Sequence, residues 1–166
     1  MKVTVIVETP KGSRNKYAFD PESGAIELSR VLPEGMIFPN DFGFIPGTKA
    51  DDGDPIDVLL LMDAPAFPGC RVESRLIGVI EGEQTEKGET NRNDRLIAVA
   101  EESYTHSDVR ELRDLNRTFL KEIDEFFIAY HKVQGRTFKV LRHGGPGKAA
   151  RLLRAAYTKE GNQEAA

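Results

Sequence analysis

The sequence predicts an α+β fold that is mainly β, a β-barrel with helices flanking it in the C-terminal third. Three observations support this prediction. Short β-branched and apolar runs, separated by turns rich in Gly, Pro and Asn-Asp, fill the first hundred residues. Apolar residues then recur at helical spacing. No repeat, low-complexity stretch or linker-like segment divides the chain, so we expect a single domain over residues 1–166.

The predicted strands are short runs of apolar and β-branched residues between well-marked turns. Residues 20–24 read Asp-Pro-Glu-Ser-Gly and residues 66–69 read Ala-Phe-Pro-Gly, which are typical turn compositions. On this basis the strands are Val3–Thr9, Lys16–Phe19, Ile26–Leu32, Ile56–Met62, Arg71–Glu81 and Arg95–Ala100.

Two amphipathic segments predict helices. The first follows Asn116, a suitable N-cap, and its apolar residues recur at i, i+3 and i+4. The second follows the Gly-Gly-Pro-Gly stretch at 144–147, with Leu152, Leu153 and Ala156 on one stripe and basic residues on the other. We expect both helices to lie against the barrel.

Composition and charge narrow the class of protein. The net charge is −4 and the pI about 5.5, so no basic field favours nucleic acid. The apolar run Val3–Val7 stops at Glu8, which is too short for a signal sequence or a membrane span. The lone Cys70 has no disulfide partner in the chain. These features predict a cytoplasmic enzyme or binding protein with no nucleic-acid or membrane partner.

Four aspartates within residues 51–57 are the strongest chemical signal. Asp52 and Asp54 lie two residues apart, which in extended backbone places both side chains on one side. Pro55 then turns the chain so that Asp57 can approach them. Carboxylates this close repel one another, and a hard divalent cation such as Mg²⁺, Mn²⁺ or Ca²⁺ relieves the repulsion. A solvated Asp-Gly turn is the competing interpretation.

The pattern around these aspartates excludes two common loops. An EF-hand would place its third ligand on Ile56 and would end on a glutamate that is missing. A P-loop needs Ser or Thr after Gly147-Lys148, where Ala149 stands. Single cations such as Lys16 and Arg30 are usually surface charges. Beside an acidic metal loop, however, they also suit a small, highly charged phosphate ligand.

Several motifs together resemble the family I soluble inorganic pyrophosphatases. The first are the segment from Pro10-Lys11-Gly12 to Lys16-Tyr17, Arg30, and the stretch from Phe38 to Ile45. The family's signature follows as Asp52-Gly53-Asp54-Pro55-Ile56-Asp57-Val58. Phe126-Phe127 and Tyr130 resemble that family's late helix. The resemblance implies a five-stranded, oligonucleotide-binding-like (OB-like) β-barrel. It also implies several Mg²⁺ ions, with Mn²⁺ as an alternative, and hydrolysis of inorganic diphosphate to two phosphates.

The resemblance also implies roles for individual residues. Asp52 and Asp57 resemble metal ligands, Glu8 resembles a carboxylate that binds metal through water, and Asp54 resembles the residue that orients or deprotonates the attacking water. Lys16, Arg30 and Tyr130 resemble groups that hold phosphate oxygens. Bacterial members are commonly hexamers, so the resemblance implies a homo-oligomer.

Other positions depart from the family pattern. A second-shell glutamate of the family falls on Ala18, and two active-site tyrosines fall on Phe38 and Phe42, which keep the ring and lose the hydroxyl. Two metal-ligand aspartates fall on Gln84 and Asn93, and a lysine falls on Arg95. The loop expected at 81–95 offers Asp94, Glu83, Glu86 or Glu89 as replacement ligands. Either His131 or Lys132 takes the place of the family's second phosphate-binding lysine.

These departures leave alternative functions open. The chain could hydrolyse diphosphate with altered metal use, or another phosphoanhydride such as a nucleotide or a polyphosphate. A barrel that binds phosphate ligands without catalysis is disfavoured, because Asp52, Asp54, Asp57, Glu8, Lys16 and Arg30 are all present.

Overall fold

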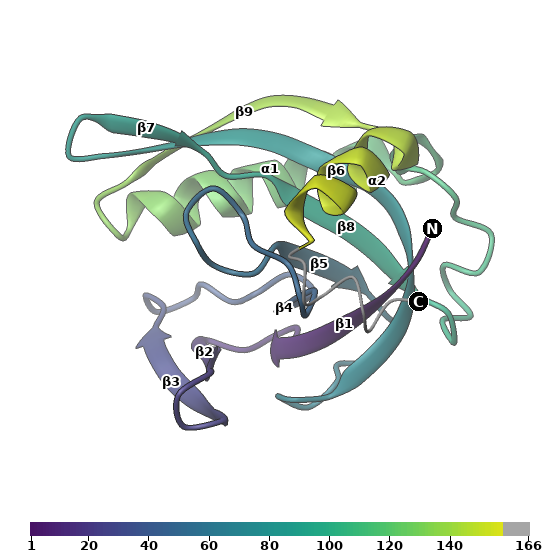
Figure 1. Cartoon of the computed structure of the whole chain (residues 1–166), viewed down its shortest axis with the longest axis horizontal. Helices are drawn as coiled ribbons and strands as arrows, with labels where there is room; N and C mark the ends of the chain where they lie inside the picture. Colours follow the sequence, from purple (N-terminus) through teal and green to yellow (C-terminus); the bar gives the residue numbers. More distant parts are fainter. Residues whose placement is uncertain (158–166) are drawn as a thin grey trace.

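The computed structural model describes residues 1–157, and its centre is a closed ring of five strands (Figure 1). The ring order is β1 (Lys2–Thr9), β4 (Asp41–Phe44), β5 (Asp57–Leu61), β8 (Arg95–Ala100) and β6 (Arg71–Glu86). A second pairing between β1 and β6 closes it. All neighbours in the ring are antiparallel except β5 and β8, which are parallel. The predicted five-stranded barrel is confirmed.

Strand β6 is long enough to reach beyond the ring. Its far end pairs on one edge with β7 (Glu89–Arg92) and on the other with β9 (Thr137–Gly144). The three strands form a ribbon that extends from the ring at the upper left of Figure 1. Strands β2 (Asn15–Asp20) and β3 (Ala25–Val31) form a separate hairpin at the lower left.

Two α-helices flank the ring, as predicted. Helix α1 (Arg117–Lys132) begins after Asn116, whose side chain accepts a hydrogen bond from the Thr118 amide at 2.8 Å. Helix α2 (Pro146–Ala156) begins with proline, which costs no hydrogen bond in a first turn. A short 3₁₀ helix spans Leu112–Asp114.

Alternate residues of β5 serve two separate apolar cores, which is why this strand is buried on both faces. Leu59 and Leu61 join the core that α1 covers, together with Phe42 and Phe127. Val58 and Leu60 join the core that contains the β1 valines and residues of α2, such as Leu153. The acidic residues just before β5 are therefore anchored by a rigid strand.

The structure differs from the sequence prediction in three places. Segment β4 reads Asp-Phe-Gly-Phe and was not among the predicted strands, yet all four of its residues are buried in the ring. Residues 81–95 were expected to form a loop and instead form the β6–β7 hairpin, which turns at Lys87 and Gly88, both with positive φ. Strand β9 interrupts the C-terminal third, which was expected to be helical throughout.

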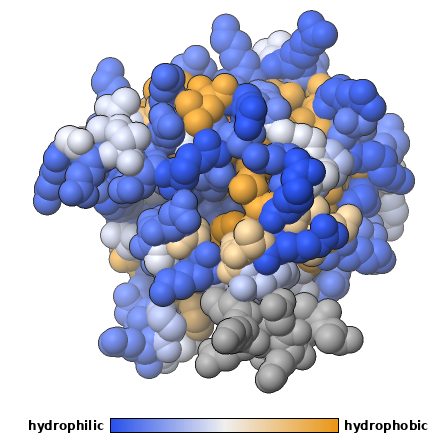
Figure 2. Space-filling view, turned by 45° about the horizontal axis from the view of Figure 1, so that its top comes forward, coloured by the Kyte–Doolittle hydropathy of each residue, from blue (hydrophilic) through white to orange (hydrophobic). Residues whose placement is uncertain are grey.

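The face of the molecule in Figure 2 is mainly hydrophilic, with apolar side chains showing in small patches between charged ones. No helix within residues 1–157 is long and apolar enough to cross a membrane.

Candidate active site

The acidic loop, residues 51–57, is a tight turn that ends where β5 begins. The Asp54 amide donates to Oδ1 of Asp52 at 3.1 Å, and the Ala50 amide donates to the Asp54 carbonyl oxygen at 2.7 Å. Gly53 has φ of +94°, a conformation that favours glycine. Asp52 and Asp54 are exposed on this turn, whereas Asp57 is half-buried at the start of β5.

Asp57 is the point at which several charges meet. Burial raises the pKa of its carboxyl, Arg95 and Lys16 lower it, and the neighbouring carboxylates of the loop raise it. Nη1 of Arg95 lies 2.5 Å from Oδ2 of Asp57. Because β5 and β8 are parallel, with Val58 opposite Leu96, the residues that precede this pair also face each other. The register of β5 and β8 therefore places Arg95 beside Asp57.

Glu8 approaches the same charges from β1. Burial raises the pKa of Glu8 to about 7, although the Phe19 amide opposes the shift by donating to Oε1 at 2.7 Å. The Asp57 carboxylate raises this pKa as well, and the Lys16 ammonium lowers it. The structure thus brings Glu8, Lys16 and the acidic loop within electrostatic reach of one another.

Two cations of the β2–β3 hairpin lie side by side. Lys16 and Arg30 are paired in the antiparallel register. Nζ of Lys16 lies 5.6 Å from the centre of the Tyr130 ring, so it is held over the end of α1. Tyr130 is buried, and its ring packs against Phe38 and Phe126. Arg30 is exposed and free to extend toward a ligand.

His131 and Lys132 lie in different environments. Lys132 is exposed, whereas His131 is buried and its ring stacks on Phe138 with centroids 4.6 Å apart. Nδ1 of His131 lies 2.7 Å from the Phe127 carbonyl oxygen and donates to it, so Nε2 is the acceptor of a neutral ring. Burial, followed by the charge of Arg95, lowers its pKa to about 4. Of the two, His131 is the residue within electrostatic reach of Arg95 and Lys16, and at neutral pH it adds no positive charge.

Arg95, Asn93 and Asp94 come from the start of β8 and the residues just before it, and their side chains have separate partners. Arg95 donates to the side-chain oxygen of Asn93, whose Nδ2 donates to Oε1 of Gln84 at 2.7 Å. Asp94 instead accepts from Arg92 at 2.7 Å and from the Gly82 amide at 3.0 Å. Asp94 is thus engaged by protein donors on the β6–β7 ribbon.

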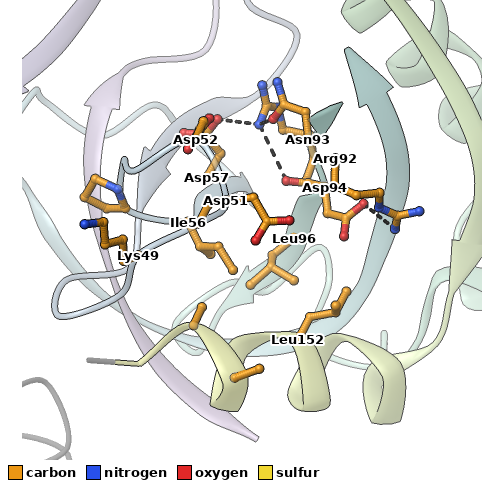
Figure 3. A pocket seen from close by; sticks show the side chains of 15 residues that line it. Lys49, Asp51, Asp52, Ile56, Asp57, Arg92, Asn93, Asp94, Leu96 and Leu152 are labelled. Atoms are coloured by element: carbon orange, nitrogen blue, oxygen red, sulfur yellow. Dashed lines mark hydrogen bonds and ion pairs between the residues drawn. The ribbon is translucent and has the colours of Figure 1, made fainter. Parts of the chain in front are cut away.

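A pocket of about 160 Å³ lies behind Asp57, between the acidic loop, the start of β8 and α2. Figure 3 shows Asp52 and Asp57 at one end, Asp51 and Asp94 nearer its middle, and Leu152 of α2 along the opposite wall. Glu8, Lys16 and Tyr130 do not line this pocket. They approach the acidic loop from the side of β1, β2 and α1.

The acidic loop has the donor chemistry of a divalent-metal site without a preformed cluster of ligands among the described residues. Within residues 1–157, no three His, Cys, Asp or Glu side chains converge into a ready-made metal cluster. The donor chemistry nevertheless suits a hard cation, because Asp52, Asp54 and Asp57 offer carboxylate oxygens on one short turn. The pKa of Asp57 is raised first by burial and further by the charges of Asp52 and Asp54, and a bound cation would relieve that repulsion.

Sequence reasoning missed one member of this neighbourhood. Phe127 was expected only as a helix core residue, yet its ring and that of Phe42 lie 5.7 and 5.9 Å from the Arg95 guanidinium. The sequence signal for this role is the pair of adjacent aromatic residues at 126 and 127. Neighbouring residues on a helix point to different sides, so the two rings contact different parts of the structure.

A closed β-ring with an acidic turn, and with the cations Lys16 and Arg30 on a neighbouring hairpin, defines a class of β-barrel proteins with clustered charges of both signs. Comparison with known proteins identifies the family within that class. The family model for inorganic pyrophosphatase matches residues 5–160. The chain belongs to the inorganic pyrophosphatase family.

Individual relatives agree over nearly the whole length. The inorganic pyrophosphatase of Geobacillus stearothermophilus is 39% identical over 151 residues, covering 91% of this chain and 89% of the relative. The crystal structure of inorganic pyrophosphatase from Thermus thermophilus has a TM-score of 0.85 at 37% identity, covering 93% of this chain and 88% of the other. The Helicobacter pylori inorganic pyrophosphatase structure has a TM-score of 0.86 at 34% identity, covering 93% and 91%.

Proposed function

We propose that the chain hydrolyses inorganic diphosphate to two phosphates at the site centred on Asp57. In this reaction a water oxygen bonds to one phosphorus, the bond from that phosphorus to the bridging oxygen breaks, and the other phosphate leaves. The observation that carries the proposal is the acidic turn that ends at Asp57, whose carboxylate pairs with Arg95 at 2.5 Å, with Lys16 and Arg30 paired on the β2–β3 hairpin. The family membership over residues 5–160 supports the same activity.

We assign Mg²⁺ as the cofactor, several ions being expected, with Mn²⁺ as a substitute. Divalent ions are general in this family and, when bound, lower the pKa of bound water and neutralise phosphate charge. Asp52 and Asp57 would hold the metal through carboxylate oxygens, with Glu8 acting through water. Asn93 and Asp94 are the further candidate ligands, although both have protein partners in the structure.

The remaining residues bind substrate and move the proton. Asp54 is the exposed carboxylate that would orient the attacking water and accept its proton. Lys16 and Arg30 would bind the phosphate oxygens by charge-assisted hydrogen bonds, with Tyr130 supporting Lys16. Arg95 and Phe42 are further candidate substrate-binding residues; Arg95 also pairs with Asp57, and Phe42 packs against Arg95. For the second group on α1 we assign His131 in place of the exposed Lys132, because Arg95 and Lys16 both act on the pKa of His131.

A substrate panel tests the proposal. Phosphate release from diphosphate, ATP and tripolyphosphate would be measured with Mg²⁺ or Mn²⁺, for the wild type, Asp57→Asn and Asp108→Asn. Asp108 is exposed in the loop after β8, so its variant is a matched control for the charge change. We expect diphosphate turnover that Asp57→Asn abolishes and Asp108→Asn preserves. Turnover of ATP or tripolyphosphate alone would indicate a different phosphoanhydride, and no turnover at all would indicate a phosphate-binding barrel.

We further propose that the chain is a single domain, works in the cytoplasm and forms a homo-oligomer, with a hexamer as the form that the family resemblance implies. The sharing of β5 between both apolar cores supports one domain, although residues 158–166 lie outside the described part. Light scattering on the purified protein tests the assembly. A mass near 18.5 kDa in solution would contradict it.

A further inference from the structure

Arg95 is held in a slot that suits a guanidinium. Only 6% of the residue is exposed, and the Phe42 and Phe127 rings lie 5.9 and 5.7 Å from its guanidinium carbon. A planar, delocalised cation packs well between aromatic rings, and its fork of donors reaches several acceptors at once. A lysine ammonium is a compact charge and would not pack against both rings as the guanidinium does. The position is therefore built for arginine and not merely for positive charge.

Nη1 of Arg95 makes one contact with a charged group and two with neutral groups, the longer of which is to the Asp94 carbonyl oxygen at 3.5 Å. Nη1 lies 2.5 Å from Oδ2 of Asp57 and also donates to the Asn93 side-chain oxygen. Asn93 is in turn oriented by Gln84, which accepts from its Nδ2 at 2.7 Å. The side-chain amides of Asn93 and Gln84 are neutral. Asp57 is therefore the only charged partner of Arg95 among the described residues. The full charge of Arg95 is thus directed at Asp57.

We infer that Arg95 is a permanent, protein-supplied cation at Asp57 and takes the place of one divalent ion. This inference rests on the metal-dependent site proposed above. A carboxylate carries a single negative charge, and one oxygen of Asp57 already has a cation at ion-pair distance. A second cation at that oxygen would be repelled by the guanidinium. The amides at 84 and 93 add no negative charge that would offset the repulsion.

The charges of the acidic loop support this substitution. Asp52, Asp54 and Asp57 contribute three negative charges, and residues 84 and 93 contribute none. Carboxylates at 84 and 93 would add two more and would compete with Asp57 for Arg95. The site therefore needs fewer divalent ions to neutralise its carboxylates, because Arg95 supplies part of the positive charge.

Counting bound Mn²⁺ by electron paramagnetic resonance tests the inference without substrate. The wild type, Arg95→Gln and Arg117→Gln would be saturated with Mn²⁺ and the ions per chain compared. Arg117 is exposed at the start of α1, so its variant controls for the loss of one positive charge. We expect Arg95→Gln to bind one ion more per chain than the wild type and Arg117→Gln. An equal or smaller number in folded Arg95→Gln would overturn the inference.

A second variant covers the case in which Arg95→Gln does not fold. Asn93→Asp is nearly isosteric and places a carboxylate beside Arg95, which frees the Arg95-paired oxygen of Asp57 for a further metal ion. We expect it also to bind one more Mn²⁺ per chain than the wild type, and Asn116→Asp, which keeps an N-cap oxygen, to match the wild type. No gain in Asn93→Asp would overturn the inference. The predicted gains without phosphate release would support it while contradicting the proposed hydrolysis.

Discussion

The carboxylate of Glu81 is buried beneath the guanidinium of Arg142, with Oε2 2.5 Å from Nε. Arg92 and Lys148 also contact Oε1 of Glu81, at 3.0 and 3.4 Å. One buried anion thereby joins β6 to β7, β9 and α2 close to the pocket behind Asp57. The hydrogen bond from Arg142, together with those from the other two cations, lowers the pKa of Glu81 to about 2.

Glu81→Gln should destabilise the fold, because three cations would then face a neutral amide. We expect a loss of about 2 kcal/mol in the free energy of unfolding, since breaking a buried ion pair leaves the remaining charges uncompensated. Urea denaturation at pH 7 measures the change. Glu89→Gln, an exposed position on β7, should unfold at the wild-type midpoint. Equal midpoints for both variants would show that the cluster contributes little.

Gly43→Ala should be among the most damaging single substitutions near the site. A Cβ at this position would overlap the Ile6 carbonyl oxygen and lie 2.8 Å from the Ile6 carbonyl carbon. Backbone cannot move aside cheaply within a ladder, so we expect a cost of about 3 kcal/mol or more. Thermal unfolding measures it. Gly147→Ala on α2, where a Cβ meets nothing within 4 Å, should show no loss of stability.

The buried His131 should make the fold less stable as pH falls. Its ordinary pKa of 6.5 is lowered to about 4 in the folded state, so between these pH values the unfolded chain binds a proton that the folded chain does not. Stability is therefore full above pH 6.5 and declines toward pH 4, by on the order of 3 kcal/mol. His131→Asn, which can still donate to the Phe127 carbonyl oxygen, should show a shallower decline from pH 7 to pH 5 in urea denaturation. Parallel declines would contradict the assignment.

Lys16 and Lys132 should contribute very differently to turnover. Lys16 lies beside the acidic loop and over Tyr130, so Lys16→Gln should lower kcat/KM for diphosphate about a hundredfold, the typical effect of losing one charged donor. Lys132 is exposed beyond the site, and Lys132→Gln should leave kcat/KM near the wild-type value. Initial rates at fixed Mg²⁺ measure both. A large loss in Lys132→Gln would place Lys132, rather than His131, at the phosphate.

The sequence predicts the elements whose local signals are strong. The turns at 20–24 and 66–69 separate strands that the structure contains, and α1 begins after Asn116 as expected. Strand β4 was missed because Asp-Phe-Gly-Phe is short and lacks β-branched residues. Strand β9 was missed because most of its side chains are exposed or half-buried, which removes the apolar signal.

In the candidate site, too, the sequence predicts the residues with a local signal and misses the contacts that depend on the fold. The acidic loop is contiguous in sequence, so its aspartates could be identified before the fold was known. The ion pair between Asp57 and Arg95 could not, because it depends on the parallel register of β5 and β8. The burial of His131 and exposure of Lys132 likewise follow from which face of α1 meets β9 and Phe138. His131 and Lys132 are neighbours in the chain, so the sequence alone does not show which of the two is buried.

The most direct test of the account is the conversion of diphosphate to orthophosphate with Mg²⁺, followed by ³¹P nuclear magnetic resonance. We predict that the wild type replaces the diphosphate resonance with that of orthophosphate. Asp54→Asn should slow the conversion about a thousandfold, since it removes the proton acceptor at the exposed turn. A wild-type protein that leaves diphosphate intact with excess Mg²⁺, or an Asp54→Asn variant as fast as the wild type, would contradict the account.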